Sequence, residues 1–187
     1  MSKTFPIEDV IPLIQHGHLH YGENKVQEAL DKWRDIKSKN NSIKLHLIGR
    51  LQTNKVKFAL KIFDYIHSLD SEKLANKIAD EQVKQEKKPK IFIQVNIGKE
   101  DQKSGINKEN LTDFYKFCKN LNLNIIGTMC IPPNDEKIVS YFSEMNKINQ
   151  EINLKELSMG MSGDYFEAIQ NNATYIRVGS KIFGNRV

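Results

Sequence analysis

The chain has 187 residues, a length typical of one domain, and we expect residues 1–187 to form a single domain with a sizeable core. Hydrophobic residues make up 39% and charged residues 27%, the balance of a soluble protein. No apolar run approaches the roughly 20 residues of a membrane-spanning helix. The first residues lack the apolar segment of a secretory signal, so we expect a cytoplasmic protein with no membrane partner. The two cysteines, Cys118 and Cys130, have no CxxC spacing and predict neither disulfide nor zinc framework.

The net charge of +5 would suit an anionic cofactor or a nucleic acid. Arginine, which nucleic-acid surfaces favour, supplies only four of the 28 basic residues, namely Arg34, Arg50, Arg177 and Arg186. The lysines spread along helical stretches without interleaved aromatic residues, and no binding motif is present. We therefore interpret the charge as a solvated basic surface and expect no nucleic-acid partner. An RNA- or DNA-binding module is a rival hypothesis that salt-dependent binding would test.

Strand-like and helical runs alternate along the whole chain. The strand-like runs are 18–22, 44–49, 64–69, 90–97, 123–131, 156–160 and 174–179. Apolar residues recur at helical spacing in the segments that precede, separate or follow them, at 6–17, 24–39, 54–63, 71–86, 108–120, 135–152 and 163–172. The segment 6–17 is the weakest helix, because Pro12 interrupts its pattern.

Seven such alternations favour a parallel sheet with crossover helices. KIFIQVNI and LNIIGTMCI are nearly continuously apolar, as expected of strands that are covered on both faces. An open doubly wound sheet and an eight-stranded α/β barrel both fit. Because no GxGxxG follows the first strand, we favour a (β/α)8 TIM barrel, with residues 1–3 as the end of its first strand.

Two loops at the carboxyl ends of the last strands, MGMSGDYFEAI and VGSKIFG, carry small residues where helices begin. In barrels these ends carry the chemistry, and the last two loops often bind phosphate. Ser162 and Gly163 can offer a hydroxyl and backbone N–H groups to an anion, and Gly179 and Ser180 can do the same. Alternatively, Ser162 is a helix N-cap and Gly179 a turn residue.

Lys3 would stand at the carboxyl end of the first strand, beside this phosphate site. A lysine amine whose pKa is lowered by burial forms Schiff bases with aldehydes. A phosphorylated aldehyde that bridges Lys3 and the two turns would be pyridoxal 5′-phosphate. Strand alternation places Arg177 on the same face as Tyr175 and Gly179, where it would face the pyridine nitrogen. The alternative for Lys3 is a solvated lysine near a terminus.

A metal-dependent barrel hydrolase is a further alternative, because HGHLH at 16–20 would place His18 and His20 on one strand face. His46 and His67 lie on later strands, but neither is expected at a carboxyl end, and no ExxH-type motif supports a metal site.

The sequence resembles the pyridoxal phosphate homeostasis protein family over essentially its whole length. The matching segments are SKTFP (2–6), YGENKVQEALDK (21–32), HLIGRLQTNK (46–55), IQVNIGKEDQKSG (93–105), LSMGMSGDYFEAI (157–169) and IRVGSKIFGNR (176–186). The resemblance implies a barrel like that of alanine racemase, with the cofactor on Lys3 and phosphate contacts from Ser162, Gly179 and Ser180. It also implies that Arg177 lies near the pyridine nitrogen and that Asn24 contacts the cofactor ring.

The implied function is a carrier that holds pyridoxal phosphate as a lysine Schiff base, in intracellular homeostasis of the cofactor and of amino acids, without robust catalysis. A weak enzyme resembling alanine racemase is the alternative. Apo forms of enzymes that use the cofactor are candidate partners, and the family resemblance favours a monomer. Family members carry about one helix and most of a strand before the SKT segment, so we expect both to be missing upstream of Met1.

Overall fold

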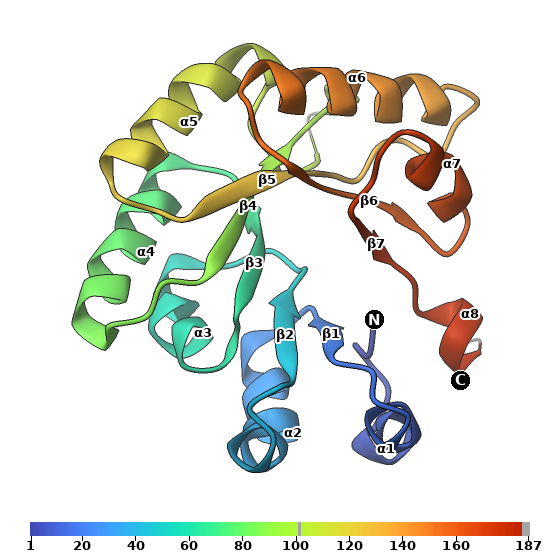
Figure 1. Ribbon diagram of the computed structural model, residues 1–187. Helices are drawn as coiled ribbons and strands as arrows, with labels where there is room; N and C mark the ends of the chain where they lie inside the picture. The colour runs from blue at the N-terminus through green and yellow to red at the C-terminus, as the bar shows by residue number, and fades with distance from the viewer. Residues whose placement is uncertain (101, 185–187) are drawn as a thin grey trace.

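The computed structural model describes residues 1–100 and 102–184. Its sheet is parallel throughout, with the strands in chain order. The strands are β1 (His20–Glu23), β2 (Lys44–Leu47), β3 (Tyr65–Leu69), β4 (Lys90–Val95), β5 (Ile125–Cys130), β6 (Glu156–Met161) and β7 (Tyr175–Arg177). Figure 1 shows them curling around a common centre into a nearly closed barrel. The seven strand-like runs and the barrel expected from the sequence are confirmed, and the open doubly wound sheet is not found.

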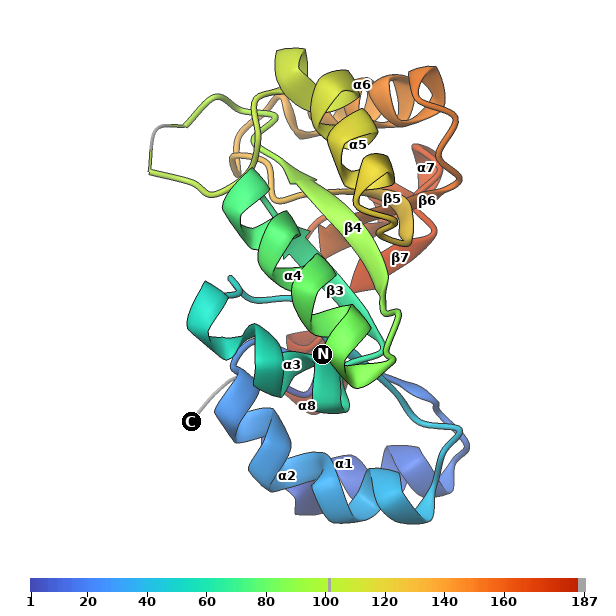
Figure 2. The same cartoon turned by 90° about the vertical axis from the view of Figure 1, so that its left-hand side faces the viewer.

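One helix, α1, precedes β1, each of the other helices follows a strand, and the helices cover the outside of the barrel (Figures 1 and 2). They are α1 (Ile7–Gln15), α2 (Val26–Lys39), α3 (Val56–Ile62), α4 (Glu72–Gln85), α5 (Leu111–Asn120), α6 (Ile138–Glu151), α7 (Tyr165–Gln170) and α8 (Ser180–Phe183). Short 3-10 turns, Thr53–Lys55 and Lys108–Asn110, lead into α3 and α5. The helix α1 continues through Pro12 without a break. Proline lacks the N–H of a helical hydrogen bond, but Pro12 lies on the exposed outer face of this short helix, where the loss is tolerated.

The first two residues lie in the space between β1 and β7. The Ser2 N–H donates to the carbonyl oxygen of Gly22 in β1 at 3.1 Å. The Met1 nitrogen donates to the carbonyl oxygen of Val178, directly after β7. Met1 and Ser2 thus bond on both sides where an eighth strand would stand, although they do not form a regular strand. The expectation that a first helix and most of a first strand are missing from this chain stays a prediction.

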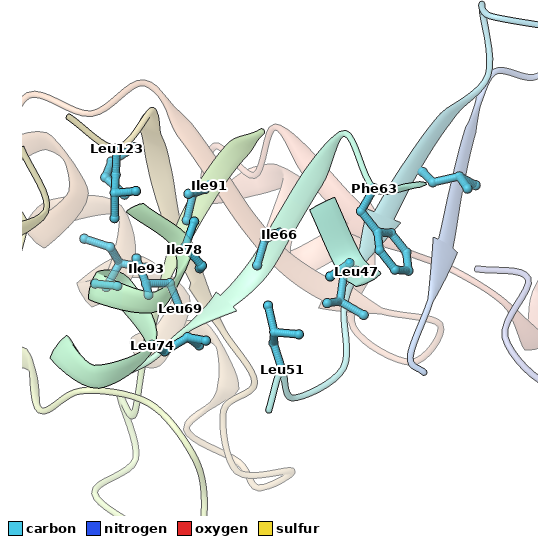
Figure 3. Close-up of a cluster of buried hydrophobic side chains, with 14 of the residues drawn as sticks. Leu47, Leu51, Phe63, Ile66, Leu69, Leu74, Ile78, Ile91, Ile93 and Leu123 are labelled. Carbon is cyan, nitrogen blue, oxygen red and sulfur yellow. The ribbon is translucent and has the colours of Figure 1, made fainter. Parts of the chain in front are cut away.

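Most of the hydrophobic core lies between the sheet and the helices. Outward-facing side chains of the strands meet the inner faces of the helices, as for Ile66 and Ile91 against Leu74 and Ile78 of α4 (Figure 3). All four side chains are at most 2% exposed. Because alternate residues of each strand point the other way, a second set fills the barrel interior. Its apolar members include Tyr65, Phe92 and Met129.

Asp101, Asn185 and Arg186, which belong to two of the segments that carry the family resemblance, lie outside the described residues. Among the residues that the structure describes, no helix combines the length and apolarity needed to cross a membrane.

Candidate functional site

A pocket of about 250 Å³ opens between the N-terminal segment and the turns that follow β6 and β7. Five of the six site residues predicted from the sequence line it, and Asn24 does not. The lining residues are Met1, Lys3, Phe5, Met161, Ser162, Gly163, Arg177, Gly179, Ser180 and Gly184. Within this described lining, the charged side chains are those of Lys3 and Arg177, so the pocket suits an anionic ligand.

Lys3 lies at the tip of a tight turn. The Phe5 N–H donates to the Ser2 carbonyl oxygen at 3.2 Å, which closes the turn around Lys3 and Thr4. Thr4 has φ +70°, a left-handed conformation that is uncommon for a β-branched residue. Such a backbone persists only where its surroundings hold it, and it is found most often at functional sites.

A buried carboxylate and a lysine hold this turn in place. Glu23, the last residue of β1, is 2% exposed, and its Oε1 lies 2.9 Å from Lys32 Nζ. Lys32 Nζ also donates to the Ser2 and Phe5 carbonyl oxygens at 2.8 Å each. Ser2 Oγ and Trp33 Nε1 donate to the same Glu23 oxygen at 2.8 and 2.9 Å. The segment that carries Lys3 is therefore fixed to β1 and α2.

The turns after β6 and β7 are joined to each other at the opposite wall of the pocket. Ser162 Oγ accepts the Gly179 N–H at 3.2 Å. Gly179 is buried beside the N-terminal segment, and a Cβ there would lie 3.2 Å from the Met1 carbonyl oxygen. The helices that follow, α7 and α8, have six and four residues, so local N–H and hydroxyl groups, rather than long helix dipoles, would face an anion here.

Arg177 is 5% exposed and held by two strands. Its NH1 donates to the Ser158 carbonyl oxygen and to Ser158 Oγ at 2.9 and 2.8 Å, and its NH2 donates to the Cys130 carbonyl oxygen at 2.7 Å. Burial lowers the pKa of Arg177 from its ordinary value, but an arginine stays charged at neutral pH. The Cys130 thiol is also buried, which raises its pKa to about 12 and makes it inert.

Asn24 directly follows β1, one residue beyond the buried Glu23. Its Oδ1 is one of four buried side-chain polar atoms in the described chain that have no hydrogen-bond partner. Its backbone packs so closely on Gly49 that a Cβ on that glycine would lie 2.2 Å from the Asn24 carbonyl oxygen. This close contact fixes the backbone of Asn24, and its side-chain amide oxygen is an acceptor without a partner.

The histidines do not form the metal site that the hydrolase alternative requires. β1 begins at His20, so His18 lies before the strand, and the expectation that both share a strand face is wrong. Gly17, at φ +90°, turns the chain there, and His18 Nε2 bonds to the His20 carbonyl oxygen. Among the described residues, no group of three or more potential ligands could hold a metal ion. The ring nitrogens of His20, His46 and His67 instead bond to one another.

Pattern reasoning missed Glu23 and Lys32. The available signal was Glu23 itself, an acidic residue at the end of a strand that is otherwise expected to be buried. A buried carboxylate requires a partner. Lys32 lies nine residues further on in an amphipathic helix and has no mark that distinguishes it from the solvated lysines around it.

Comparisons with known proteins give consistent results. A family model for the N-terminal domain of alanine racemase matches residues 3–187. The chain is 38% identical to the pyridoxal phosphate homeostasis protein of Aquifex aeolicus, over 99% of this chain and 85% of the relative. It is 31% identical to the protein of that name from Escherichia coli, over 100% of this chain and 84% of the relative.

Solved structures agree with these relatives. PipY of Synechococcus elongatus, in a structure with pyridoxal phosphate bound, is 32% identical and has a TM-score of 0.89, covering 98% of this chain and 90% of PipY. An alanine racemase of Clostridium difficile has a TM-score of 0.74 at 12% identity, covering 95% of this chain and 48% of the racemase, which indicates a shared fold alone. The resemblance and the alanine-racemase type of barrel expected from the sequence are confirmed.

Proposed function

The chain belongs to the family of pyridoxal phosphate homeostasis proteins, and from this membership we propose that it is a carrier of pyridoxal 5′-phosphate. The cofactor would be held as a Schiff base by Lys3, in homeostasis of the cofactor and of amino acids. The observation that carries the proposal is the pocket in which Lys3, Arg177 and two turns of serine and glycine converge.

The residues present fit this cofactor. A cavity of about 250 Å³ is slightly smaller than the roughly 300–1,000 Å³ of pockets for drug-sized ligands, which suits a compact cofactor. An anionic phosphate would gain from the two cations of the lining, Lys3 and Arg177. The partnerless Asn24 Oδ1, beyond the described lining, is a buried acceptor for a ligand donor.

Each predicted residue has a role in this proposal. The aldehyde of pyridoxal phosphate condenses with amines, and Lys3 supplies the lysine amine of the described pocket lining. Ser162, Gly179 and Ser180 would receive the phosphate. Arg177 would direct a guanidinium N–H at the pyridine nitrogen and keep that nitrogen unprotonated. Asn24 would contact the ring.

The lining supports a carrier better than a robust enzyme. Racemisation requires an acid or base on each side of the substrate. Among the described lining residues, Lys3 is the one side chain suited to proton transfer near neutral pH, because arginine keeps its protons. A weak activity like that of alanine racemase is the alternative, and an assay of alanine racemisation at saturating cofactor separates the two. A rate far below that of a racemase supports the carrier.

Absorption spectroscopy tests cofactor binding directly. Pyridoxal phosphate added to the chain is expected to give a visible imine band that saturates at one equivalent. Lys3→Ala is expected to abolish the band. Lys181→Ala is the matched control, because Lys181 lies on α8 beside the pocket without lining it. A band that survives Lys3→Ala and disappears in Lys181→Ala would contradict the assignment.

The remaining expectations concern the cell. A cytoplasmic carrier would pass its cofactor to apo enzymes, and the resemblance favours a monomer for this task. Mixing the loaded chain with an apo enzyme that requires pyridoxal phosphate, and following recovery of that enzyme's activity, tests the transfer.

A further inference from the structure

Three of the five histidines form a continuous chain of side-chain hydrogen bonds through the barrel. His20 Nδ1 lies 2.9 Å from His46 Nε2, and His46 Nδ1 lies 2.9 Å from His67 Nε2. His67 Nδ1 lies 2.9 Å from Ser158 Oγ, the atom that accepts from Arg177 NH1. One end of this chain is therefore an exposed ring and the other is the buried arginine of the candidate pocket.

Aromatic neighbours hold the two inner rings in place. His46 stacks on Tyr65 with 4.1 Å between ring centroids, and His67 stacks on Phe92 at 4.2 Å. Both histidines are at most 5% exposed. A cavity of about 80 Å³ borders the rings and Arg177 on the remaining side.

The inner rings are neutral. Burial lowers the pKa of His46 to about 3 and that of His67 well below its ordinary value, and the charge of Arg177 opposes a second cation beside it. A neutral imidazole has one nitrogen that donates and one that accepts. Each inner ring therefore donates from one nitrogen and accepts at the other. The hydrogen bonds that link the histidines consequently all point in the same direction, from donor to acceptor.

Arg177 fixes that direction. A guanidinium can only donate, so Ser158 Oγ is the acceptor in their bond. Among the described residues, Ser158 Oγ bonds to Arg177 and to His67. Because Arg177 cannot accept, the Ser158 hydroxyl donates its proton to His67 Nδ1. Each of the three rings then carries its proton on Nε2, and the series of hydrogen bonds ends at the exposed Nε2–H of His20. The opposite direction would leave a buried hydroxyl proton without an acceptor.

We propose that His20, His46 and His67 are positioning residues, whose directed chain holds the Ser158 hydroxyl as an acceptor and so fixes the guanidinium of Arg177 at the pocket. The consequence for cofactor binding rests on the proposed function, whereas the direction of the chain does not. The three rings would act on a ligand through Arg177 without touching it.

Nitrogen-15 NMR of the histidine side chains in the full chain tests the direction without any cofactor. The expected result at pH 7 is a proton on Nε2 and a bare Nδ1 in both His46 and His67. A proton on Nδ1 of either ring, or a doubly protonated ring, would overturn the proposal.

Pyridoxal phosphate titrations of His67→Phe, Ser158→Ala and the double variant test the coupling to Arg177. Each is expected to weaken binding by about 2- to 12-fold, the factor that corresponds to one ordinary hydrogen bond, and the double variant by no more than one single. His67→Asn, whose Oδ1 can accept where Nδ1 does, is expected to recover most of the affinity. His16→Phe is the matched control, because His16 is exposed and does not belong to the chain of histidine hydrogen bonds.

The two hypotheses fail separately. The positioning role would be contradicted if the binding losses of His67→Phe and Ser158→Ala added up in the double variant. It would also be contradicted if His67→Asn bound the cofactor as weakly as His67→Phe. Absence of cofactor binding by the unmodified chain would overturn the proposed function, and the NMR result would then decide the direction of the histidine chain by itself.

Discussion

The Nζ atom of Lys32 lies 2.9 Å from the buried Oε1 of Glu23, and the same ammonium binds two carbonyl oxygens of the turn that carries Lys3. This ion pair joins the end of β1 to α2 and to the N-terminal segment. The position of Lys3 thus depends on a pair of residues that do not line the pocket.

Replacing Lys32 by methionine is expected to destabilise the fold by about 3 kcal/mol, since it leaves the Glu23 carboxylate buried without its cation. Urea unfolding measures this loss. Lys25→Met is the matched control, because Lys25 and Glu28 form an ion pair at the surface, where pairs contribute less than about 1 kcal/mol. Equal effects of the two substitutions would contradict the structural role of Lys32.

Lys32→Met is also expected to weaken covalent capture of pyridoxal phosphate, because Ser2 and Phe5 lose the donor that holds their carbonyl groups. The rate of formation of the imine band, compared at equal folded fraction, measures this effect. An unchanged rate would show that the turn around Lys3 holds its shape without Lys32.

The two buried histidines predict a stability that falls with acid. Burial lowers the pKa of His46 to about 3 and that of His67 well below its ordinary value, whereas the unfolded chain binds a proton at each near pH 6.5. Below about pH 6.5 the unfolded state therefore binds more protons, and the free energy of unfolding decreases as the pH falls. The slope approaches about 1.4 kcal/mol per pH unit for each ring.

Urea unfolding at intervals between pH 7 and pH 5 measures that slope. His67→Phe removes one titrating ring, so its slope is expected to be smaller by up to about 1.4 kcal/mol per pH unit. A slope that is the same in both proteins would mean that His67 takes up a proton in the folded state.

Gly49 is expected to tolerate no side chain. Its added Cβ would lie 2.2 Å from the Asn24 carbonyl oxygen, and relief of that clash would separate the ends of β1 and β2. Gly49→Ala should cost at least about 2 kcal/mol, as overpacking against rigid backbone does. Gly163→Ala, where a Cβ meets nothing within 4 Å, should change stability by less than about 0.5 kcal/mol. Thermal unfolding compares them, and similar losses would contradict the close approach.

The sequence predicted a parallel sheet covered by helices because its strand-like runs are apolar and its helices amphipathic, and the absence of GxGxxG favoured a barrel over an open sheet. The first six residues of KIFIQVNI form β4, and Ile91, Phe92 and Ile93 in it are fully buried, as continuous apolar runs indicate. Local signals also indicated the two turns that line the pocket, since the loops after the last two strands of a barrel often bind phosphate and both carry small residues.

Contacts between distant residues could not be predicted in the same way. The histidine chain requires that β2 and β3 pair with His46 opposite Tyr65, and an irregular register follows between β3 and β4. Residue spacing does not fix such a register, so the sequence left a metal site open as an alternative for the same histidines. The Glu23–Lys32 ion pair could not be predicted either, because burial distinguishes it from a surface pair and residue type does not.

The most direct test of the central claim is reduction with borohydride after pyridoxal phosphate is added in equimolar amount, followed by peptide mass mapping. Lys3 is one of 24 lysines, so chance modification would seldom select it. The carrier proposal predicts a single reduced adduct on Lys3, which disappears in Lys3→Ala without moving to another residue. An adduct spread over surface lysines, or one on a different lysine, would contradict the proposal.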